Sequence, residues 1–462
     1  MRNLRVSPPF RSRNQPPFFY NAPVSAAESE VVNVLRDLIR LDTSNPPGNE
    51  RAAADYIAAR ARAEGIEPVV VESKPGRASV ILRLSGNGTK PPLLLSAHLD
   101  VVPAQESGWD HPPFRGDLAD GYIWGRGAVD MKHMAAMSLT TLFELKRRGV
   151  PLARDVIFAG VADEEAGGRL GAGHLVDHRR ELVSAEYALT EVGGMAVPSG
   201  NGVIVPVQVA EKGFMWLRLR AKGNAGHGSM PDPDSAVARL SQAVSRLSRK
   251  PLQYRLTPAA RAFFSALASL QPAAGRAALL GLLSGPTAPF ALKMIPAERR
   301  RVFRAMLHDT AAVTCMNAGV KVNVIPGSAT AEVDGRYLPG VTRQEFLEEI
   351  RRAVGDLVEI EVTDEAPPVE TRPGTPLWDS IVTVMGRALP GARVSPYLTP
   401  GFTDAKHYTR AGITTYGFAP VKLKADEPFT ALYHAPNERI SVSGLEAGTS
   451  WLYEIVSDFC RK

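Results

Sequence analysis

The sequence predicts an α/β protein with a mixed, mostly parallel sheet and a smaller α+β domain inserted into it. In the first half of the chain, short apolar runs alternate with stretches of helical periodicity, which is typical of a parallel sheet covered by helices. After residue 211 the order becomes strand, helix, strand, strand, helix, strand, and near residue 369 the first pattern returns. At 462 residues the chain is also long enough for two domains.

The larger domain is expected to comprise residues 28–211 and 369–462. Apolar runs bounded by turn residues predict its strands at 67–72, 78–84, 93–97, 155–162, 187–190 and 414–418. Helical spacing predicts its helices at 30–41, 49–65, 131–148, 171–178, 376–389 and 443–459. Residues 1–27 have no apolar segment of the secretory type, so we expect a disordered arm there.

The inserted domain is expected over residues 212–368. Its predicted strands are 215–221, 312–318, 329–337 and 358–363, and its predicted helices are 234–248 and 346–354. This β-α-β-β-α-β order is typical of a ferredoxin-like domain. A long helical segment, about 257–308, separates the first helix from the second strand.

Composition excludes several classes of function. The net charge is +6, but four arginines precede the first acidic residue, Glu28, and leave about +2 for the rest of the chain. We therefore expect no nucleic-acid partner, and the basic run at 298–304 is expected on a solvated helix face. No segment is long and apolar enough to predict a membrane contact. Cys315 and Cys460 form no disulfide framework, so a cytoplasmic setting is the simplest interpretation.

His98-Leu99-Asp100 is the first motif that indicates chemistry. It follows the apolar run 93–97, and residues two apart on a strand project to the same face. The carboxyl ends of strands are where open α/β sheets place their sites. A ligating histidine usually has a partner on its second ring nitrogen, often a carboxylate. Alone, the triplet is weak evidence for a metal site, because many His-x-Asp triplets are surface accidents.

Further polar motifs also follow predicted strands or precede helices. They are Asp130 in 125–132, Asp163-Glu164-Glu165 after 156–162, Glu191 after 187–190, and His434 in the loop 433–438. Each has a structural alternative: Asp130 as a helix N-cap, the acidic triplet as a solvated turn, Glu191 and His434 as isolated structural residues. Three adjacent acids at the end of a buried strand nevertheless call for a cation, because neighbouring carboxylates repel. In an extended segment, Glu164 and Glu165 are expected to point apart.

Together and in this order, the motifs resemble those of the M20 family of metallopeptidases and amidohydrolases, from about residue 28 to the C-terminus. The family includes aminoacylase, acetylornithine deacetylase and carboxypeptidases. The resemblance implies two divalent metal ions. His98, Asp130 and Glu191 would hold one, and Asp130, Glu165 and His434 the other. Zinc is expected from these ligand types, which also admit cobalt or manganese. Asp100 would orient His98, and Glu164 would be the general base toward a water activated by the metals.

The resemblance also implies a substrate side within and beside the inserted domain. His227 in Gly226-His227-Gly228 matches the histidine that stabilises the oxyanion, often across a dimer interface, so a homodimer through the lid domain is expected. Residues matching substrate-binding positions are Asn323, Arg336, Gly401 and Thr403. An arginine fork suits a free carboxylate. The alternatives are a surface ion pair of Arg336 with Asp334 and a simple turn at Gly401.

Two departures from the family pattern stand out. His133 occupies a position that is usually glycine, and it either approaches the metals or caps a helix. The segment 257–308 exceeds the compact lids of many members and resembles those of the carboxypeptidase S and N-acyl-amino-acid hydrolase branch. Its apolar residues either roof an acyl pocket or only pack helices together; they include Phe263, Phe264, Leu279, Leu280 and Leu283.

The resemblance thus implies a zinc-dependent hydrolase of the amide bond in an N-acyl amino acid or short peptide with a free carboxylate. Glu191, in place of an Asp, is closer to the aminoacylase and carboxypeptidase branch. One alternative is a desuccinylase or deacetylase of a diamino acid. Another is a catalytically silent binding member of the fold. A dinucleotide-binding oxidoreductase is disfavoured because Gly223, Gly226 and Gly228 lack the required spacing.

Overall fold

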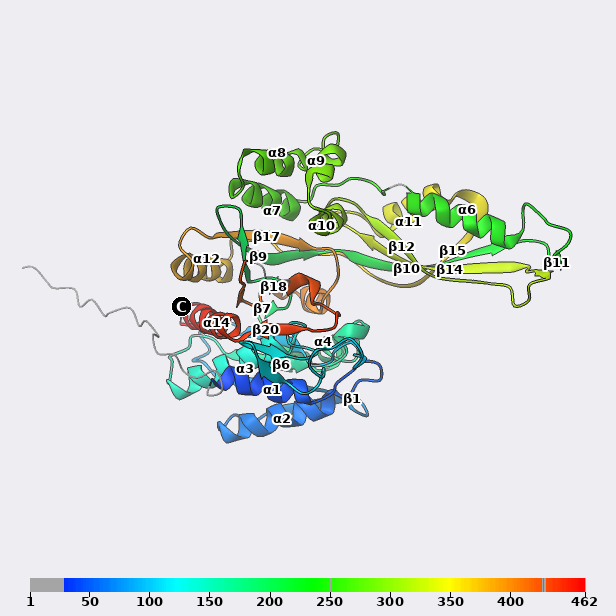
Figure 1. Ribbon diagram of the computed structural model, residues 1–462. Coiled ribbons are helices and arrows are strands. Elements are labelled where there is room, and N and C mark those ends of the chain that lie inside the picture. Colours follow the sequence, from blue (N-terminus) through cyan, green and yellow to red (C-terminus); the bar gives the residue numbers. More distant parts are fainter. Residues whose placement is uncertain (1–28, 250, 426, 428, 462) are drawn as a thin grey trace, which may run out of the picture.

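The computed structural model describes residues 29–249, 251–425, 427 and 429–461. The expectation of a disordered arm at 1–27 lies outside these residues. The described chain folds into a larger lobe around one long sheet and an elongated smaller lobe that projects from it (Figure 1).

Among the described residues, eleven strands form the sheet of the larger lobe. They are β1 (Val69–Lys74), β2 (Arg77–Leu84), β3 (Leu93–His98), β6 (Val156–Val161), β7 (Tyr187–Thr190), β8 (Met195–Ser199), β9 (Gly202–Glu211), β16 (Val369–Glu370), β17 (Arg393–Thr399), β18 (Thr414–Gly417) and β19 (Val421–Lys422). The order is β1-β2-β6-β3-β7-β18-β9-β8-β19, with β16 and β17 paired to β9. Strands β6, β3, β7 and β18 are parallel, whereas β1-β2-β6 and β18-β9-β8 are antiparallel. The sheet is therefore mixed, with a parallel centre.

Both faces of this parallel centre are buried. Leu93 and Leu95 of β3 belong to one hydrophobic core, whereas Leu94 between them belongs to a second core on the opposite face. This is why the run 93–97 is apolar throughout and does not alternate. The helices of the lobe are α1 (Glu30–Arg40), α2 (Glu50–Ala63), α3 (Lys132–Arg147), α4 (Ala172–His178), α5 (Arg180–Val183), α12 (Pro376–Ala388), α13 (Ala405–Arg410) and α14 (Val442–Cys460). A small sheet of β4 (Asp117–Ala119), β5 (Tyr122–Trp124) and β20 (Arg439–Ser441) lies beside them.

The smaller lobe has the predicted order of elements. Its antiparallel strands are β10 (Gly213–Lys222), β12 (Thr310–Ala318), β14 (Ser328–Tyr337) and β15 (Glu359–Ala366), in the order β12-β14-β10-β15. Helices α6 (Ala236–Arg249) and α11 (Arg343–Val354) pack together on this sheet, and η2 (Gly355–Leu357) follows α11. At its outer end, β11 (Gly226–His227) pairs with β13 (Val324–Ile325) (Figure 1).

The long helical segment forms α7 (Pro258–Ser269), α8 (Ala273–Gly281), α9 (Ala288–Met294) and α10 (Ala297–Leu307). Helix α7 packs on β17 and β9, so this segment covers the sheet of the larger lobe. Phe263 lies 5.1 Å from the ring of Tyr397 on β17, and Phe264 lies 5.0 Å from the ring of Phe303. Helix packing therefore accounts for both phenylalanines, whereas Leu280 is 46% exposed.

Five described strands of the larger sheet were not anticipated from the sequence. Two of them, β16 and β19, are only two residues long, and the other three are β8, β9 and β17. Pro198, Pro206 and Pro396 interrupt their runs and weaken the strand pattern. The N-cap alternative for Asp130 is wrong, because α3 begins at Lys132 and its N-cap residue is Met131. Within the part of the chain that the structure describes, we find no helix with the length and apolarity needed to cross a membrane.

Candidate metal centre

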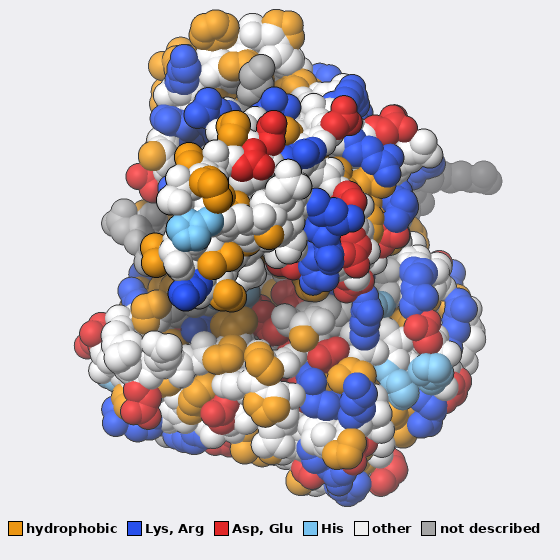
Figure 2. All heavy atoms as spheres, turned by 90° about the vertical axis from the view of Figure 1, so that its right-hand side faces the viewer, with side chains coloured by type: hydrophobic (Ala, Val, Ile, Leu, Met, Phe, Trp, Pro, Cys, Tyr) orange, Lys and Arg blue, Asp and Glu red, His pale blue; other side chains and the backbone are white. Residues whose placement is uncertain are grey.

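The predicted ligands converge at one edge of the parallel sheet. His98 ends β3, Glu164 and Glu165 lie in the turn η1 (Glu164–Ala166) after β6, and Glu191 follows β7. Because β6, β3 and β7 are adjacent and parallel, their carboxyl ends meet at this edge. The expectation of an extended acidic segment is wrong, since a 3₁₀ turn holds the two glutamates apart. Figure 2 shows a hollow between the two lobes with acidic and hydrophobic side chains inside it.

Asp130 stands between two histidines. Its Oδ1 lies 3.1 Å from His98 Nε2, and its Oδ2 lies 3.1 Å from His434 Nε2. His98 Nε2 is also 3.7 Å from a Glu191 oxygen, and His434 Nε2 is 3.2 Å from a Glu165 oxygen. The five side chains therefore form two triplets that share one carboxylate, which is the arrangement needed to bridge two cations.

The chemistry of this cluster fits divalent cations. Glu165 Oε1 and Glu191 Oε1 are buried and have no hydrogen-bond partner in the described residues. Burial raises the pKa of both carboxyls, and histidine hydrogen bonds oppose that rise. Unpaired buried carboxylates are costly, and a bound cation would offset that cost. Histidine and carboxylate donors suit zinc.

Glu164 lies beside these five side chains. Among the described residues, the ion pairs of His434 are with Asp130 and Glu165 and not with Glu164. One carboxylate oxygen of Glu164, a ring nitrogen of His98 and a carboxylate oxygen of Glu191 all lie within 4.8 Å of one another, which is close enough to surround one metal ion. Burial, followed by the charge of Glu191, raises the pKa of Glu164 well above its usual value. A carboxyl with a raised pKa is suited to hold and return a proton near neutral pH.

Asp100 supports the site differently from what the sequence suggests. The Nδ1 of His98 donates to the backbone carbonyl of Asp100 at 2.9 Å, whereas its carboxylate is 3.5 Å away. The carboxylate instead accepts the backbone N–H groups of Glu164 and Glu165, both at 3.1 Å, and the amide of Asn45 at 2.8 Å. Asp100 thus fixes the tautomer of His98 through its main chain and ties the acidic turn to the end of β3.

Glu438 is a buried support that the sequence analysis did not assign. Its carboxylate accepts the backbone N–H groups of Val129 at 2.8 Å and Asp130 at 3.2 Å, and it pairs with Arg126 at 2.6 Å. These bonds join the loop that carries His434 to the loop that carries the shared carboxylate. A signal was present, since Glu438 closes the same motif as His434.

Left-handed backbone marks the same region. Asp163, Val192 and His434 have φ angles of 75°, 62° and 60°. Each is a predicted ligand or directly adjoins one of the acidic residues Glu164 and Glu191. Such conformations are strained for residues other than glycine, and for a β-branched residue such as Val192 they are rare. Strained local backbone conformations therefore accompany the orientation of these polar side chains.

Arg336 lies on β14, in the smaller lobe, and faces the larger one. Its guanidinium is 4.7 Å from the ring of Phe402 and pairs with Asp334 at 2.7 Å. The predicted alternative of an ion pair with Asp334 is therefore present. One nitrogen, Nη1, is buried without a partner, so the fork keeps an unused donor.

Thr403 and Gly401 belong to the loop around Phe402. Thr403 is buried and donates to Glu211 at 2.8 Å. Sequence reasoning missed Lys406, which donates to the carbonyl of Thr403 at 3.1 Å and lies 4.4 Å from the ring of Phe402. Lys406 of the larger lobe and Arg336 of the smaller lobe thus place two cationic groups around the ring of Phe402.

His227 and Asn323 meet each other but not the metal ligands. They lie at the outer end of the smaller lobe, where Gly228 N–H donates to the carbonyl of Asn323 at 2.9 Å (Figure 1). Both residues are exposed, and the described polar contact of the His227 ring is with Ser229 at 2.8 Å.

Comparison with known proteins identifies the family of this chain. Residues 94–458 match Peptidase family M20/M25/M40. The chain belongs to this family. It is therefore a hydrolase that acts on amide bonds.

Individual relatives agree with this assignment. The chain is 32% identical over 379 residues to the N-fatty-acyl-amino acid synthase/hydrolase PM20D1 of Xenopus tropicalis, covering 79% of this chain and 72% of that protein. It is 29% identical over 403 residues to aminoacylase-1 of Sus scrofa, covering 85% and 88%. Among solved structures, the M20 metallo-carboxypeptidase Sso-CP2 of Sulfolobus solfataricus superposes with a TM-score of 0.70, at 18% identity over 93% of this chain and 99% of that one.

Proposed function

We propose that this protein is a zinc-dependent amidohydrolase that cleaves an N-acyl amino acid or a short peptide carrying a free carboxylate. The observation that supports the proposal is the position of Asp130, whose two oxygens face His98 and His434. His98, Asp130 and Glu191 would hold one zinc ion, and Asp130, Glu165 and His434 the other. Cobalt and manganese suit the same ligands.

Bound divalent cations would supply an activated water and polarise the substrate carbonyl. Glu164 acts as the general base, taking a proton from that water and returning it to the leaving amine. Its raised pKa, caused by burial and by the charge of Glu191, supports this role. Asp100 keeps His98 in the tautomer whose Nε2 carries the lone pair.

The substrate carboxylate is bound by the unused donor of Arg336, with Gly401 and Thr403 shaping the loop around it. Asn323 and His227 complete the site from the outer end of the smaller lobe. Because both residues are exposed there and lie away from the ligands, a second copy of the chain brings them to the site. The proposed assembly is a homodimer through the smaller lobe.

The test is hydrolysis by the zinc-loaded protein of N-acyl amino acids, dipeptides and the same compounds with an amidated carboxylate. We expect turnover only with a free carboxylate, loss of turnover after chelation, and its return with zinc. Glu164→Gln is the matched control, and it should retain metal without turnover. Equal rates on amidated substrates would contradict the carboxylate-binding role, and full activity after complete metal removal would contradict the metal mechanism.

A further inference from the structure

A small cavity lies next to the metal centre, on the side of Glu191. It has room for about one water molecule, since the centre of a water-sized sphere can move through about 10 Å³ of it. Its lining includes Met131, His133, Glu191, Met195, Phe429 and Tyr433. Met131 directly follows the ligand Asp130, and Tyr433 directly precedes His434. The cavity thus adjoins the reacting centre and has mostly apolar walls.

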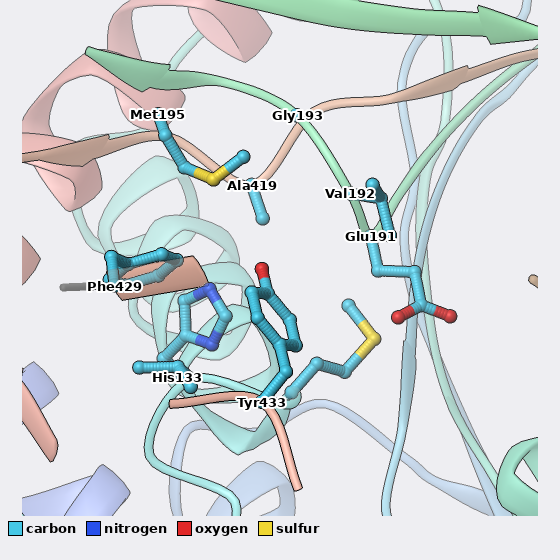
Figure 3. A pocket seen from close by; sticks show the side chains of 10 residues that line it. His133, Glu191, Val192, Gly193, Met195, Ala419, Phe429 and Tyr433 are labelled. Carbon is cyan, nitrogen blue, oxygen red and sulfur yellow. The ribbon is translucent and has the colours of Figure 1, made fainter. Parts of the chain in front are cut away.

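Three rings close the inner wall of this cavity. The imidazole of His133 meets the ring of Phe429 edge-on, with centroids 6.4 Å apart, and Phe429 meets Tyr433 in the same way at 5.9 Å. Figure 3 shows these rings on one side of the space, with Met195 and Ala419 across from them. Because the rings pack against one another, their side chains cannot yield easily to a larger guest.

His133 contributes shape here and no visible polar contact. It is 3% exposed, and its Nδ1 has no hydrogen-bond partner among the described residues. Burial lowers its pKa to about 4, so the ring is neutral. Most buried polar groups are hydrogen-bonded, so this histidine is not explained as a structural hydrogen-bonding residue. As the second residue of α3, it is also not the N-cap.

The positions of the cationic side chains indicate which part of a substrate binds in the cavity. Arg336 and Lys406 lie around Phe402, and both are cations suited to a carboxylate. The cavity beside Glu191 instead presents methionine, valine and aromatic side chains. In an N-acyl amino acid the carboxylate and the acyl group lie on opposite sides of the scissile amide, so a substrate whose carboxylate binds at the cations can place its acyl group in the apolar cavity.

We propose that this cavity is the acyl subsite and that His133 sets its length, so that the preferred acyl group is acetyl-sized. The inference rests on the proposed function and deepens it. The free space accepts about one water-sized sphere, so a methyl group nearly fills it, whereas every further methylene must displace a packed ring or methionine. His133 is a specificity-determining residue that contacts the end of the acyl group.

The experiment compares acetyl, butyryl, hexanoyl and dodecanoyl derivatives of one amino acid. For the zinc-loaded wild type, kcat/KM should fall at least about tenfold from acetyl to hexanoyl, since a single methylene in a pocket changes the ratio by about 10–200-fold. In His133→Gly the cavity gains the space of the imidazole, so the hexanoyl-to-acetyl ratio should rise at least about tenfold. Met195→Ala widens the opposite wall and should shift the ratio in the same direction.

Met137→Ala is the matched control. Met137 is buried one turn further along α3 and does not line the cavity, so its removal should leave the ratio unchanged. Dissociation constants of the same compounds, measured by calorimetry in the Glu164→Gln background, give a readout that does not depend on turnover. They should follow the same chain-length order.

The inference is overturned if the wild type prefers hexanoyl or dodecanoyl over acetyl. It is also overturned if both widened variants fold, as judged by thermal unfolding, and keep the wild-type ratio. Absence of hydrolysis of every N-acyl compound would overturn the proposed function. In that case the calorimetry decides the inference: selective binding of the acetyl compound supports the subsite, and equal or absent binding overturns it.

Discussion

The edge of the large sheet and the outer end of the smaller lobe differ in how completely one chain builds them. At the sheet edge, His98 and Asp100 are almost fully buried and hydrogen-bonded to neighbouring elements. At the outer end, His227 and Asn323 are exposed, and their hydrogen bonds within the described residues stay inside the small β11–β13 sheet and its flanking turns.

The difference shows that the two halves of the proposed site follow different rules. Packing and buried hydrogen bonds orient the metal ligands before anything binds, which is what a metal centre requires. The lobe end has no such restraint and is positioned for contact with another surface. The first half should therefore respond to substitution as a rigid unit, and the second as a part supplied by association.

The largest effect is expected inside the rigid half, from two adjacent glutamates with different tasks. Glu164→Gln should lower kcat by about 10²–10⁴-fold, the usual contribution of a general base, while two metals remain bound. Glu165→Gln should instead lower the metal content toward one per chain, because it removes a proposed ligand. Metal analysis alongside kinetics separates the two, and an identical metal content in both variants would argue against the assigned roles.

The next effect tests the exposed half. His227→Ala should lower kcat by about 10²–10³-fold, as for the loss of one oxyanion donor, with little change in thermal stability because the side chain is exposed. If a second copy supplies His227, mixing this variant with Glu164→Gln should restore about a quarter of the wild-type activity through mixed dimers.

The control for this mixing experiment pairs Glu164→Gln with Glu165→Gln. Both substitutions lie in the rigid half, so exchange of subunits should restore nothing. Restoration there, or its absence in the His227 mixture once mixed dimers are demonstrated, would remove the proposed division between the two halves.

Arg336 lies between the two regions, and its substitution should have an intermediate effect. Arg336→Ala should lower kcat/KM for free-carboxylate substrates by about 10–150-fold, the value of a charge-assisted hydrogen bond of about 1.5–3 kcal/mol. The amidated substrates should remain unhydrolysed by the variant, as by the wild type. Arg343→Ala is the matched control, since Arg343 is an exposed arginine of the same lobe, paired with Glu365. An equal loss in both variants would contradict carboxylate binding.

Glu438 sharpens the comparison because it touches no proposed substrate atom. Glu438→Gln should weaken metal binding by about 10–100-fold, as is usual for residues that hold a ligand in place. The reason is that one acceptor oxygen for the backbone of Val129 and Asp130, or for Arg126, is lost. Competition with a chelator measures the change, and an unaltered zinc affinity would show that the loop is held by other contacts.

The smallest effect concerns pH and stability. Burial raises the pKa of Glu211 to about 7. The folded metal-free protein thus keeps a proton that the unfolded chain loses near pH 4.5, so this residue makes the free energy of unfolding fall as pH rises from about 4.5 to about 7. Glu211→Gln should remove that part of the slope, at most roughly 3 kcal/mol. Denaturant titrations across this range measure it, and parallel wild-type and variant curves would contradict it.

Much of the fold was predictable because local patterns carried it. The apolar run 93–97 and the helical spacing at 443–459 correspond to β3 and α14 with small shifts at their ends. The strands missed by the sequence, such as β9 and β17, contain prolines that weaken the pattern. They are stable because parallel pairing with each other and cover from α7 compensate for the local cost.

By itself, the sequence determined which residue types stand at the strand ends, and hence that acids and histidines gather at one edge of the sheet. Only the tertiary structure decided which of these side chains contact one another and which residues hold them in place. The two faces of Asp130, the bonds between Asp100 and the acidic turn, and the support by Glu438 all depend on contacts between segments about 30 to 310 residues apart. Orientation at the ångström level comes from packing and buried hydrogen bonds, which no local pattern encodes.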